Sequence, residues 1–593
     1  MKGRVKKSFF RLGLWRMRHV PQRQFMIFLS IVIGIMSGLA AVILKNIIHL
    51  TEHWLTHGLH IESSNYIYFL YPGIGIFLTW LFVRFVVKDN ISHGVARILY
   101  SISKRGSILK PHNTWSSMIA SALTIGFGGS VGSEAPIVLT GASLGSVTGK
   151  WLHLNYKQRT LLLGCGAAGA IAGIFKAPMT GVIFTLEILM LELTLSSIVP
   201  LLLSSVTAAV VAYLLMGQGV LFSFKITDPF LVKDLPFFIL LGIFTGLVSL
   251  YFTKISMLVE EKMSSLQNIW MRIMAGASAL GVLIFLFPTL FGEGYTTIRS
   301  LLHGDVSILV ANSPFYSILD RTPLFLFYVA LIFLMKVVAM AVTNGAGGVG
   351  GVFAPSLFTG GVSGFFLARL INLISGARVS EVNFALVGMA GLMAGVMHAP
   401  LTGIFLIAEI TGGYALLIPL IITATVSYLT IVYFEPYSIY TKRLARRGEL
   451  ITHDKDHAVM VLMDWRREIE KDLVTVRPDD TLGDLVKAIS HSHRNIFPVL
   501  GEGDTLLGVV MLDNVREIMF DRDLYDKVKV RDLMISPPRF IYLTDTMETV
   551  LRKFNESGAW NLPVLDRDRY VGILSKSRIF ASYRRMLQQM SEE

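Results

Sequence analysis

The feature of this sequence that most constrains its fold is a duplicated pair of proline-containing motifs set among apolar segments. Gly-Ser-Glu-Ala-Pro at 132–136 precedes Gly-Ile-Phe-Lys-Ala-Pro-Met-Thr-Gly at 173–181. The order recurs downstream, where Gly-Val-Phe-Ala-Pro at 351–355 precedes Gly-Val-Met-His-Ala-Pro-Leu-Thr-Gly at 395–403. Duplicated halves whose apolar helices are interrupted by Gly and Pro are typical of membrane transport proteins. Such proteins bind their substrate at the repeat interface, between the ends of broken helices.

The composition agrees with a membrane protein. Of the 593 residues, 53% are apolar and 16% are charged, which is far from the average of soluble domains. We predict an all-α polytopic membrane domain over 25–445, built from two inverted repeats at roughly 25–220 and 235–445, with broken or re-entrant helices. The apolar runs that are long enough, or nearly so, to span a bilayer are Phe25–Leu44, Tyr68–Val87, Ile198–Met216, Phe237–Phe252, Met271–Phe291, Leu324–Val342 and Leu416–Tyr433.

The formal net charge of +13 does not indicate a nucleic-acid partner, because many basic residues flank the apolar runs. By the positive-inside rule, both ends of the chain are cytoplasmic, including the basic segment 1–24. The first apolar run is too long for a signal peptide and is followed by no cleavage site. We expect an integral multi-pass protein of the plasma or inner membrane, in contact with lipid. The flanking basic residues are Lys2, Arg4, Lys6, Lys7, Arg11, Arg16, Arg18, Arg23, Arg443, Arg446 and Arg447.

The region 446–593 reads as soluble α/β sequence and is itself duplicated. Each copy has a strand, a helix, a Pro-Val-Leu strand, a Gly-led strand and a second helix. This order resembles the CBS domain, and the two copies, at about 465–522 and 528–588, predict a cytoplasmic CBS pair. The repeated segments are 474–482, 496–500 and 508–512 in the first copy, and 540–546, 561–565 and 572–575 in the second.

Three membrane segments resemble signature elements of the CLC chloride channel and transporter family. They are Gly-Ser-Glu-Ala-Pro at 132–136, Gly-Gly-Val-Phe-Ala-Pro at 350–355 and Ile-Tyr at 439–440. The resemblance covers nearly the whole chain after residue 25, and CBS pairs are a common extension of this family. It implies a homodimer with one anion pathway per subunit, which moves chloride and similar small anions under the control of voltage and pH.

Helix N-termini suit the binding of a permeating anion. They present free N–H donors and roughly half a positive charge each, whereas a full lysine or arginine charge would hold the ion too tightly. Glycine lets the backbone approach the ion, and proline fits the first helical turn. We therefore predict two anion-facing helix starts, against the alternative of simple kinks in apolar helices. Their expected anion-binding residues are Gly132 and Ser133 in one start and Val352, Phe353 and Ala354 in the other.

Glu134 lies inside the first of these helix starts. An ionisable residue at membrane depth is a functional candidate because its burial is costly. Its carboxylate is itself an anion, so it can fill a halide site and leave that site when protonated. By resemblance, Glu134 is the gating glutamate. The alternative is a structural helix cap.

The central anion site departs from the family pattern Gly-Ser-Gly-Ile-Pro. The matching stretch at 92–96 reads Ser-His-Gly-Val-Ala, which puts His93 at the place of the coordinating serine. His93 could donate a ring N–H and make the site pH-sensitive, Ser92 could take over by a shift in register, or the contact could be backbone only, at Gly94. By resemblance, the Tyr440 hydroxyl donates to the central ion and the Phe353 N–H faces the gate. The alternative for Tyr440 is an anchor at the membrane interface.

The proton-relay position of coupled family members matches Ile188, which carries no acid. The adjacent Glu187 and its repeat counterpart Glu409 suggest a packing role shared by both halves. This departure favours a chloride channel, and a proton/chloride antiporter that uses Glu134 alone is the alternative. A CBS-regulated divalent-cation transporter is more remote, because cation sites need clustered oxygen ligands. We find no nucleophile–base pair, metal-spaced His/Cys cluster or phosphate loop, so we expect neither an enzyme nor a metal site.

Two further features carry expectations. Lys176 and His398 precede the two Ala-Pro pairs at equivalent positions, and a charge there lies at a cytoplasmic helix mouth that attracts anions or reaches to an interface. In the CBS pair, Asn514 and Arg578 replace the ribose-binding aspartate of the family. We expect an adenine nucleotide to bind weakly or not at all, no other cofactor to be required, and the pair to support the dimer.

Overall fold

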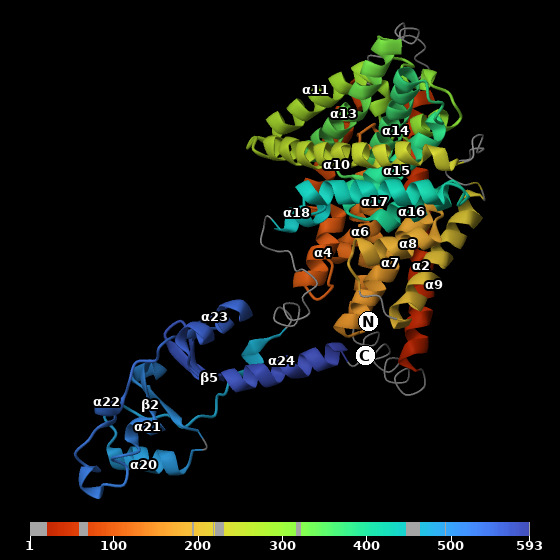
Figure 1. Cartoon of the computed structure of the whole chain (residues 1–593). Helices are drawn as coiled ribbons and strands as arrows, with labels where there is room; N and C mark the ends of the chain where they lie inside the picture. Colours follow the sequence, from red (N-terminus) through yellow and green to blue (C-terminus); the bar gives the residue numbers. More distant parts are fainter. Residues whose placement is uncertain are drawn as a thin grey trace, which may run out of the picture. The chain divides into compact units, whose positions relative to one another are not determined.

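The computed structural model describes residues 21–57, 69–191, 195–217, 219, 230–315, 322–445, 463–492 and 494–591. The chain divides into two compact units, Met1–Leu450 and Ile451–Glu593, drawn in red to teal and in blue in Figure 1. Most of the basic N-terminal residues and the charged stretch after Ala445 lie outside the described residues. Each unit is considered by itself.

The first unit is helical throughout its described part, and eight of its described helices are long and apolar enough to cross a membrane. The helices of the first repeat are α2 (Gln22–His57), α3 (Tyr71–Phe82), α4 (Gly94–Lys104), α5 (Ser116–Gly126), α6 (Glu134–Trp151), α7 (Tyr156–Phe175), α8 (Pro178–Glu187) and α9 (Leu195–Met216). Those of the second repeat are α10 (Leu235–Ser264), α11 (Ile269–Leu286), α12 (Tyr295–Leu302), α13 (Thr322–Ala346), α14 (Phe353–Ser375), α15 (Glu381–Met397), α16 (Pro400–Ile410), α17 (Leu417–Phe434) and α18 (Ile439–Ala445).

Two of the predicted apolar runs do not form single α-helices. The run Tyr68–Val87 consists of α3 followed by a π-helical turn, Val83–Val87, and Tyr68 itself lies outside the described residues. The run Met271–Phe291 is interrupted because α11 ends at Leu286 and a 3₁₀ turn, Pro288–Leu290, follows. Proline lacks the N–H that would continue the α-helical ladder.

The two repeats pack in the same way. Helices α2, α7 and α9 pack against one another in the first, and α10, α15 and α17 do so in the second, where they lie side by side in Figure 1. Helices α6 and α14 each pack on the next helix, α7 and α15. Small residues allow these close crossings: a Cβ at Gly141 would lie 2.1 Å from the Gly166 carbonyl oxygen, and one at Gly364 would lie 2.1 Å from the Phe384 carbonyl oxygen.

The repeats are joined by a reciprocal pair of helix caps between α8 and α16. Glu409, near the end of α16, accepts hydrogen bonds from the N–H and hydroxyl of Thr180 at the start of α8, at 2.8 and 2.6 Å. Glu187, at the end of α8, accepts those of Thr402 at the start of α16, at 2.8 and 2.7 Å. Carboxylates are favourable at helix N-termini. Because the end of each helix meets the start of the other, the two helices run antiparallel, as inverted repeats require.

This antiparallel arrangement bears on the two alternatives for Lys176 and His398, which were an anion-attracting cytoplasmic helix mouth and a reach to an interface. Each residue ends the helix before α8 or α16 in a left-handed conformation, with φ of 56° and 54°, so the two lie at opposite ends of the antiparallel pair. The Lys176 ammonium donates to the carbonyl oxygens of Gly217 and Gly219, at 2.7 and 2.9 Å. The His398 ring packs edge-on against Tyr428, with 5.7 Å between ring centroids.

The second unit contains two small strand-and-helix motifs. Strand β1 pairs antiparallel with β2 in the first motif, while β3 runs parallel to β4 and β4 antiparallel to β5 in the second. Short helices connect and flank them. The elements are α20 (Leu482–Ser490), β1 (Ile496–Leu500), β2 (Leu506–Met511), α21 (Leu512–Val515), α22 (Val530–Leu533), β3 (Ile541–Tyr542), α23 (Met547–Ser557), β4 (Asn561–Asp566), β5 (Arg569–Ser575) and α24 (Lys576–Ser591).

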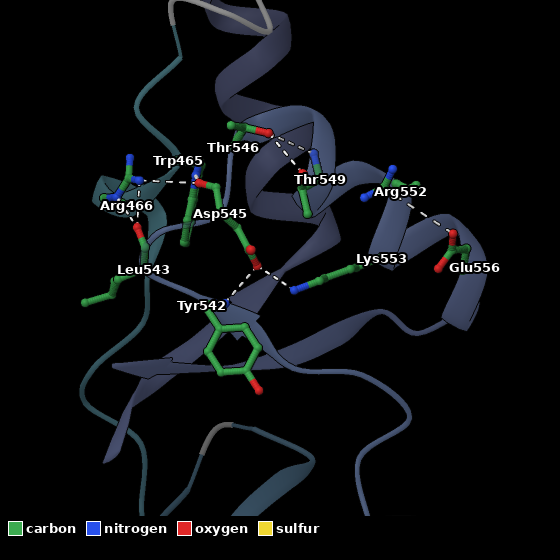
Figure 2. A network of polar contacts seen from close by, with 10 residues as sticks. All are labelled: Trp465, Arg466, Tyr542, Leu543, Asp545, Thr546, Thr549, Arg552, Lys553 and Glu556. Atoms are coloured by element: carbon green, nitrogen blue, oxygen red, sulfur yellow. Dashed lines mark hydrogen bonds and ion pairs between the residues drawn. The ribbon is translucent and has the colours of Figure 1, made fainter. Parts of the chain in front are cut away.

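The chain enters this unit through the second motif, not the first. Figure 2 shows Arg466 donating to the Leu543 carbonyl oxygen and Trp465 donating through Nε1 to that of Asp545, at 2.6 and 3.2 Å. The Asp545 carboxylate accepts from the Tyr542 N–H at 2.8 Å and from the Lys553 ammonium at 2.6 Å. The entering segment therefore ties the start of the unit to β3 and α23.

Candidate functional site

Three helix starts converge in the membrane unit. The backbones of Gly132 and Gly351 exchange two hydrogen bonds, at 3.0 and 2.6 Å, which joins the chain before α6 to the chain before α14. At the start of α4, a Cβ on Gly94 would lie 2.6 Å from the Ala135 carbonyl oxygen. The glycines of the motifs are therefore required by close backbone contact. The structure brings together the predicted residues of Gly-Ser-Glu-Ala-Pro at 132–136 and of Gly-Val-Phe-Ala-Pro at 351–355.

The Glu134 side chain closes over this meeting point. The residue is 1% exposed, and its Oε1 accepts the Tyr295 hydroxyl at 2.5 Å. Its Oε2 accepts the Ala354 N–H, in the first turn of α14, at 3.4 Å. A Cβ on Gly132 would lie only 2.1 Å from that same Oε2. A carboxylate from the first repeat thus occupies a donor at the helix start of the second repeat.

The other predicted residues of the α14 start are buried and packed. Val352 is the residue before the first helical position, and Phe353 is the first residue of α14. The Phe353 ring is buried, with its centroid 5.2 Å from that of Phe175 and 6.5 Å from that of Phe184. The first N–H groups of a helix have no partner within the helix. The aromatic packing therefore holds the first turn of α14, with its backbone N–H donors, in place.

Tyr440 lies inside the membrane unit near the start of α18. It is 4% exposed, and its hydroxyl lies 4.0 Å from the Met397 sulfur. It is close enough to Glu134 and Arg443 to interact with both electrostatically. This burial does not fit an interfacial anchor, whose ring lies at the headgroup level. The position agrees with a hydroxyl that faces the pathway.

Ser92 and His93 both have partners in the protein. The Ser92 hydroxyl donates to Asn90 Oδ1 at 2.6 Å. The His93 Nδ1 lies 2.7 Å from an Arg443 nitrogen, and the same guanidinium reaches Glu260 at 2.5 Å. Of the three alternatives for the central site, this arrangement agrees best with a backbone contact at Gly94, the first residue of α4.

A cavity of about 990 Å³ opens beside His93. Its wall carries both signs of charge, and its basic side chains belong to segments far apart in the sequence. Arg443 links the cavity to the helix starts, since it contacts His93 and lies near Tyr440. Sequence reasoning treated Arg443 only as a flanking charge. The charged and titratable residues of the wall are Arg84, Lys88, Asp89, His93, Glu260, Glu261, Arg272 and Arg443.

Ile188 lies directly after α8, and its N–H donates to the Phe184 carbonyl oxygen at 2.9 Å. It is 4% exposed and joins the same apolar cluster as Phe184 and Leu189. The position of the family's proton relay is therefore filled by a buried aliphatic side chain. Nothing at this residue can accept a proton.

Two residues beside Glu134 were not predicted. Tyr295 donates to the Glu134 carboxylate, and Glu293 accepts a hydrogen bond from the neighbouring Ser133. Both lie in Gly292-Glu293-Gly294-Tyr295, an acid between two glycines that follows an apolar run. That pattern is the signal that could have found them, because an acid at membrane depth is a functional candidate.

In the second unit, Arg578 is engaged at the position of the ribose-binding aspartate. Its guanidinium lies 3.5 Å from Glu470, which also pairs with Arg494 of the first motif at 2.7 Å. Glu470 forms an isolated bridge with Ile573 of β5. The side chain that replaces the ribose ligand in the second copy, Arg578, thus belongs to an ion-pair cluster within this unit.

The sequence matches the family described as voltage gated chloride channel over residues 74–431 and the CBS domain over 467–521 and 530–585. The chain belongs to the voltage gated chloride channel family, the CLC family. The predicted fold class, a mostly helical CLC fold with a C-terminal CBS pair, is confirmed. The protein is thus a membrane transport protein for chloride, and the family comprises channels and transporters.

Relatives of this chain carry both kinds of name. It is 29% identical over 335 residues to the voltage-gated ClC-type chloride channel ClcB of Escherichia coli, covering 56% of this chain and 75% of that protein. It is 26% identical over 442 residues to the H(+)/Cl(-) exchange transporter ClcA of Vibrio cholerae, covering 71% and 89%. The relatives therefore leave both a channel and an exchanger open.

Solved structures show the same fold. A slow cyanobacterial Cl−/H+ antiporter superposes with a TM-score of 0.61 at 22% identity, covering 72% of this chain and 98% of that one. A eukaryotic CLC transporter superposes with a TM-score of 0.56 at 18% identity, covering 93% and 97%. These likenesses show the architecture alone.

The contact at Gly132 yields a testable prediction. In Gly132→Ala the new methyl group would lie 2.1 Å from the Glu134 Oε2 and 3.0 Å from the Ala354 nitrogen. It would displace the carboxylate and at the same time cover the Ala354 N–H that the anion needs, so we expect chloride flux in liposomes to fall. Gly413→Ala is the matched control, because a Cβ at Gly413 meets no atom within 4 Å. Equal flux in Gly132→Ala and the wild type would show that the Ala354 N–H does not lie on the transport pathway.

Proposed function

We propose that this protein moves chloride and similar small anions through a pathway that Glu134 closes. The observation that carries this proposal is the hydrogen bond from the Ala354 N–H to the Glu134 carboxylate. A helix N-terminus favours a negative group through its free donors and its dipole. The carboxylate and a permeating anion therefore compete for the same donor. Protonation removes the charge from Glu134 and lets the anion take its place.

The proposed pathway runs between the three converging helix starts. At its outer end lie Gly132, Ser133 and Glu134, and at its centre lie the first turn of α14 and the hydroxyl of Tyr440. At the central site we favour the backbone of Gly94, since Ser92 and His93 are held by other residues. The cavity beside His93 is the proposed inner mouth. Because outward movement of Glu134 shifts a charge across part of the membrane, voltage and pH both act on the gate.

We propose passive conduction over obligatory exchange. Exchange requires a proton path from the gate to the other side of the membrane, and the buried Ile188 blocks the position where the family carries its inner acid. Proton/chloride exchange is the second candidate, favoured by the exchanger name of a relative that aligns with 71% of this chain. In that case protons would move past the Ile188 side chain along a chain of water molecules.

The proposed assembly is a homodimer with cytoplasmic N- and C-termini, as the family resemblance implies. Apolar side chains at the starts of α8 and α16, Met179 and Leu401, are 38% and 51% exposed, which agrees with contact to a second subunit or to lipid. The CBS pair supports this dimer. In this pair Arg578, which contacts Glu470, replaces the aspartate that binds the ribose in the family. The replacement opposes nucleotide binding.

Glu134→Gln tests the gate. The amide keeps the volume of the carboxylate and lacks its charge, so we expect severalfold faster chloride flux at neutral pH and a much shallower pH dependence. Glu381→Gln is a matched control, since Glu381 is also a first-turn acid, of α15, and pairs with Arg369 at 3.1 Å. Flux that keeps the full pH dependence of the wild type in Glu134→Gln would place the gate elsewhere.

Proton coupling separates the two candidates. In sealed liposomes with a chloride gradient and the membrane potential held near zero by an ionophore, we expect chloride to move without pumping protons. External pH and chloride content are recorded together. Sustained uphill proton movement that Glu134→Gln abolishes would contradict passive conduction and establish exchange.

A further inference from the structure

A second carboxylate lies on the helix start next to Glu134. Glu293 Oε1 accepts the Ser133 N–H at 2.9 Å and the Ser133 hydroxyl at 2.6 Å. Ser133 directly precedes the first residue of α6, and its own side chain makes no capping bond to that helix. The donor at the α6 start is therefore occupied by an acid that comes from the second repeat.

Each of the two acids lies at the helix start that belongs to the other repeat. Glu134 belongs to the first repeat and accepts a hydrogen bond at the start of α14, whereas Glu293 belongs to the second repeat and accepts one at the start of α6. Ser133 is one of the residues predicted to bind the anion. An anion that enters between these helix starts therefore meets both carboxylates.

The loop that carries Glu293 is fixed by a buried lysine. Lys336 of α13 is 0% exposed, and its ammonium donates to the carbonyl oxygens of Gly292 and Leu290, at 2.9 and 3.3 Å. The same ammonium lies 4.9 Å from the centroid of the Phe358 ring. Gly292 and Gly294 have φ of +62° and +89°, so glycine flanks Glu293 where the backbone turns. The carboxylate is thereby held against Ser133.

The groups that interact with Glu293 form one linked set of charges. Glu134 from α6, Glu52 from α2 and Lys336 from α13 all interact with it electrostatically, as does Tyr295 from α12. Lys45 of α2 interacts with Glu52 and Glu134. Three carboxylates thus share two ammonium groups.

We propose that Glu293 is a second gating carboxylate, which covers the Ser133 N–H when ionised and releases it to the anion when protonated. This inference rests on the proposed function, because it assigns Glu293 to the same pathway. Full opening of the outer end then requires a proton on each of the two acids. The purely structural alternative is that Glu293 only caps α6.

Glutamine at 293 distinguishes the two roles. Its amide oxygen still accepts from Ser133, so the cap is kept, while the charge that competes with the anion is lost. Chloride flux from liposomes is measured against pH for the wild type, Glu293→Gln, Glu134→Gln, the double variant and Glu381→Gln. Flux rises as pH falls, since protonation opens the pathway. We expect a fall of about a hundredfold per pH unit in the wild type and about tenfold in either single variant, above the range where the acids titrate.

The double variant is expected to lose the pH dependence, and Glu381→Gln to match the wild type. Flux and pH slope in Glu293→Gln equal to those of the wild type, with Glu134→Gln behaving as predicted, would reduce Glu293 to a helix cap and leave the proposed function intact. A wild-type pH slope in Glu134→Gln would instead contradict the proposed function itself. Should Glu293→Gln not fold, Glu293→Asp keeps the charge on a side chain one methylene shorter, which withdraws the carboxylate from the Ser133 N–H, and its flux must exceed that of the wild type at high pH.

Discussion

The structure of the membrane unit depends on a competition for backbone donors at helix starts. A carboxylate buried at membrane depth is costly unless it is hydrogen-bonded, and Glu134 obtains these bonds from Tyr295 and from the start of α14. A chloride ion at the same place needs the same donors. The site is therefore strong enough to hold an anion and is already filled by one that belongs to the protein. In the proposed function, protonation of Glu134 empties it.

The inverted repeat is what places two such helix starts opposite each other. A single helix start in a bilayer offers donors from one side only, whereas the bridge between Gly132 and Gly351 brings the starts of α6 and α14 together. The same symmetry supplies the reciprocal caps at α8 and α16, where Glu187 and Glu409 each serve the other repeat. Acids that cross between the repeats thus stabilise the fold, and in the proposed function they also close the pathway.

The sequence was sufficient for the fold class and for the residues of the two proline motifs, because these are local patterns tied to helix chemistry. It was insufficient for contacts between distant segments. The pairing of His93 with Arg443 and that of Ser133 with Glu293 depend on how helices pack across the repeats. Helices α7 and α14 were missed as membrane spans, since their small residues weaken the apolar signal while allowing the close packing of α7 on α6 and of α14 on α15.

The central claim is that Glu134 and the permeating anion occupy the same donors, and anomalous diffraction from bromide tests it most directly. Crystals of the wild type at neutral pH and of Glu134→Gln are grown in bromide. The account predicts bromide within hydrogen-bond distance of the Ala354 N–H in Glu134→Gln, and the carboxylate in that place in the wild type. Bromide at that N–H in the wild type with the Glu134 carboxylate still bound there, or no bromide near it in Glu134→Gln, would contradict the account.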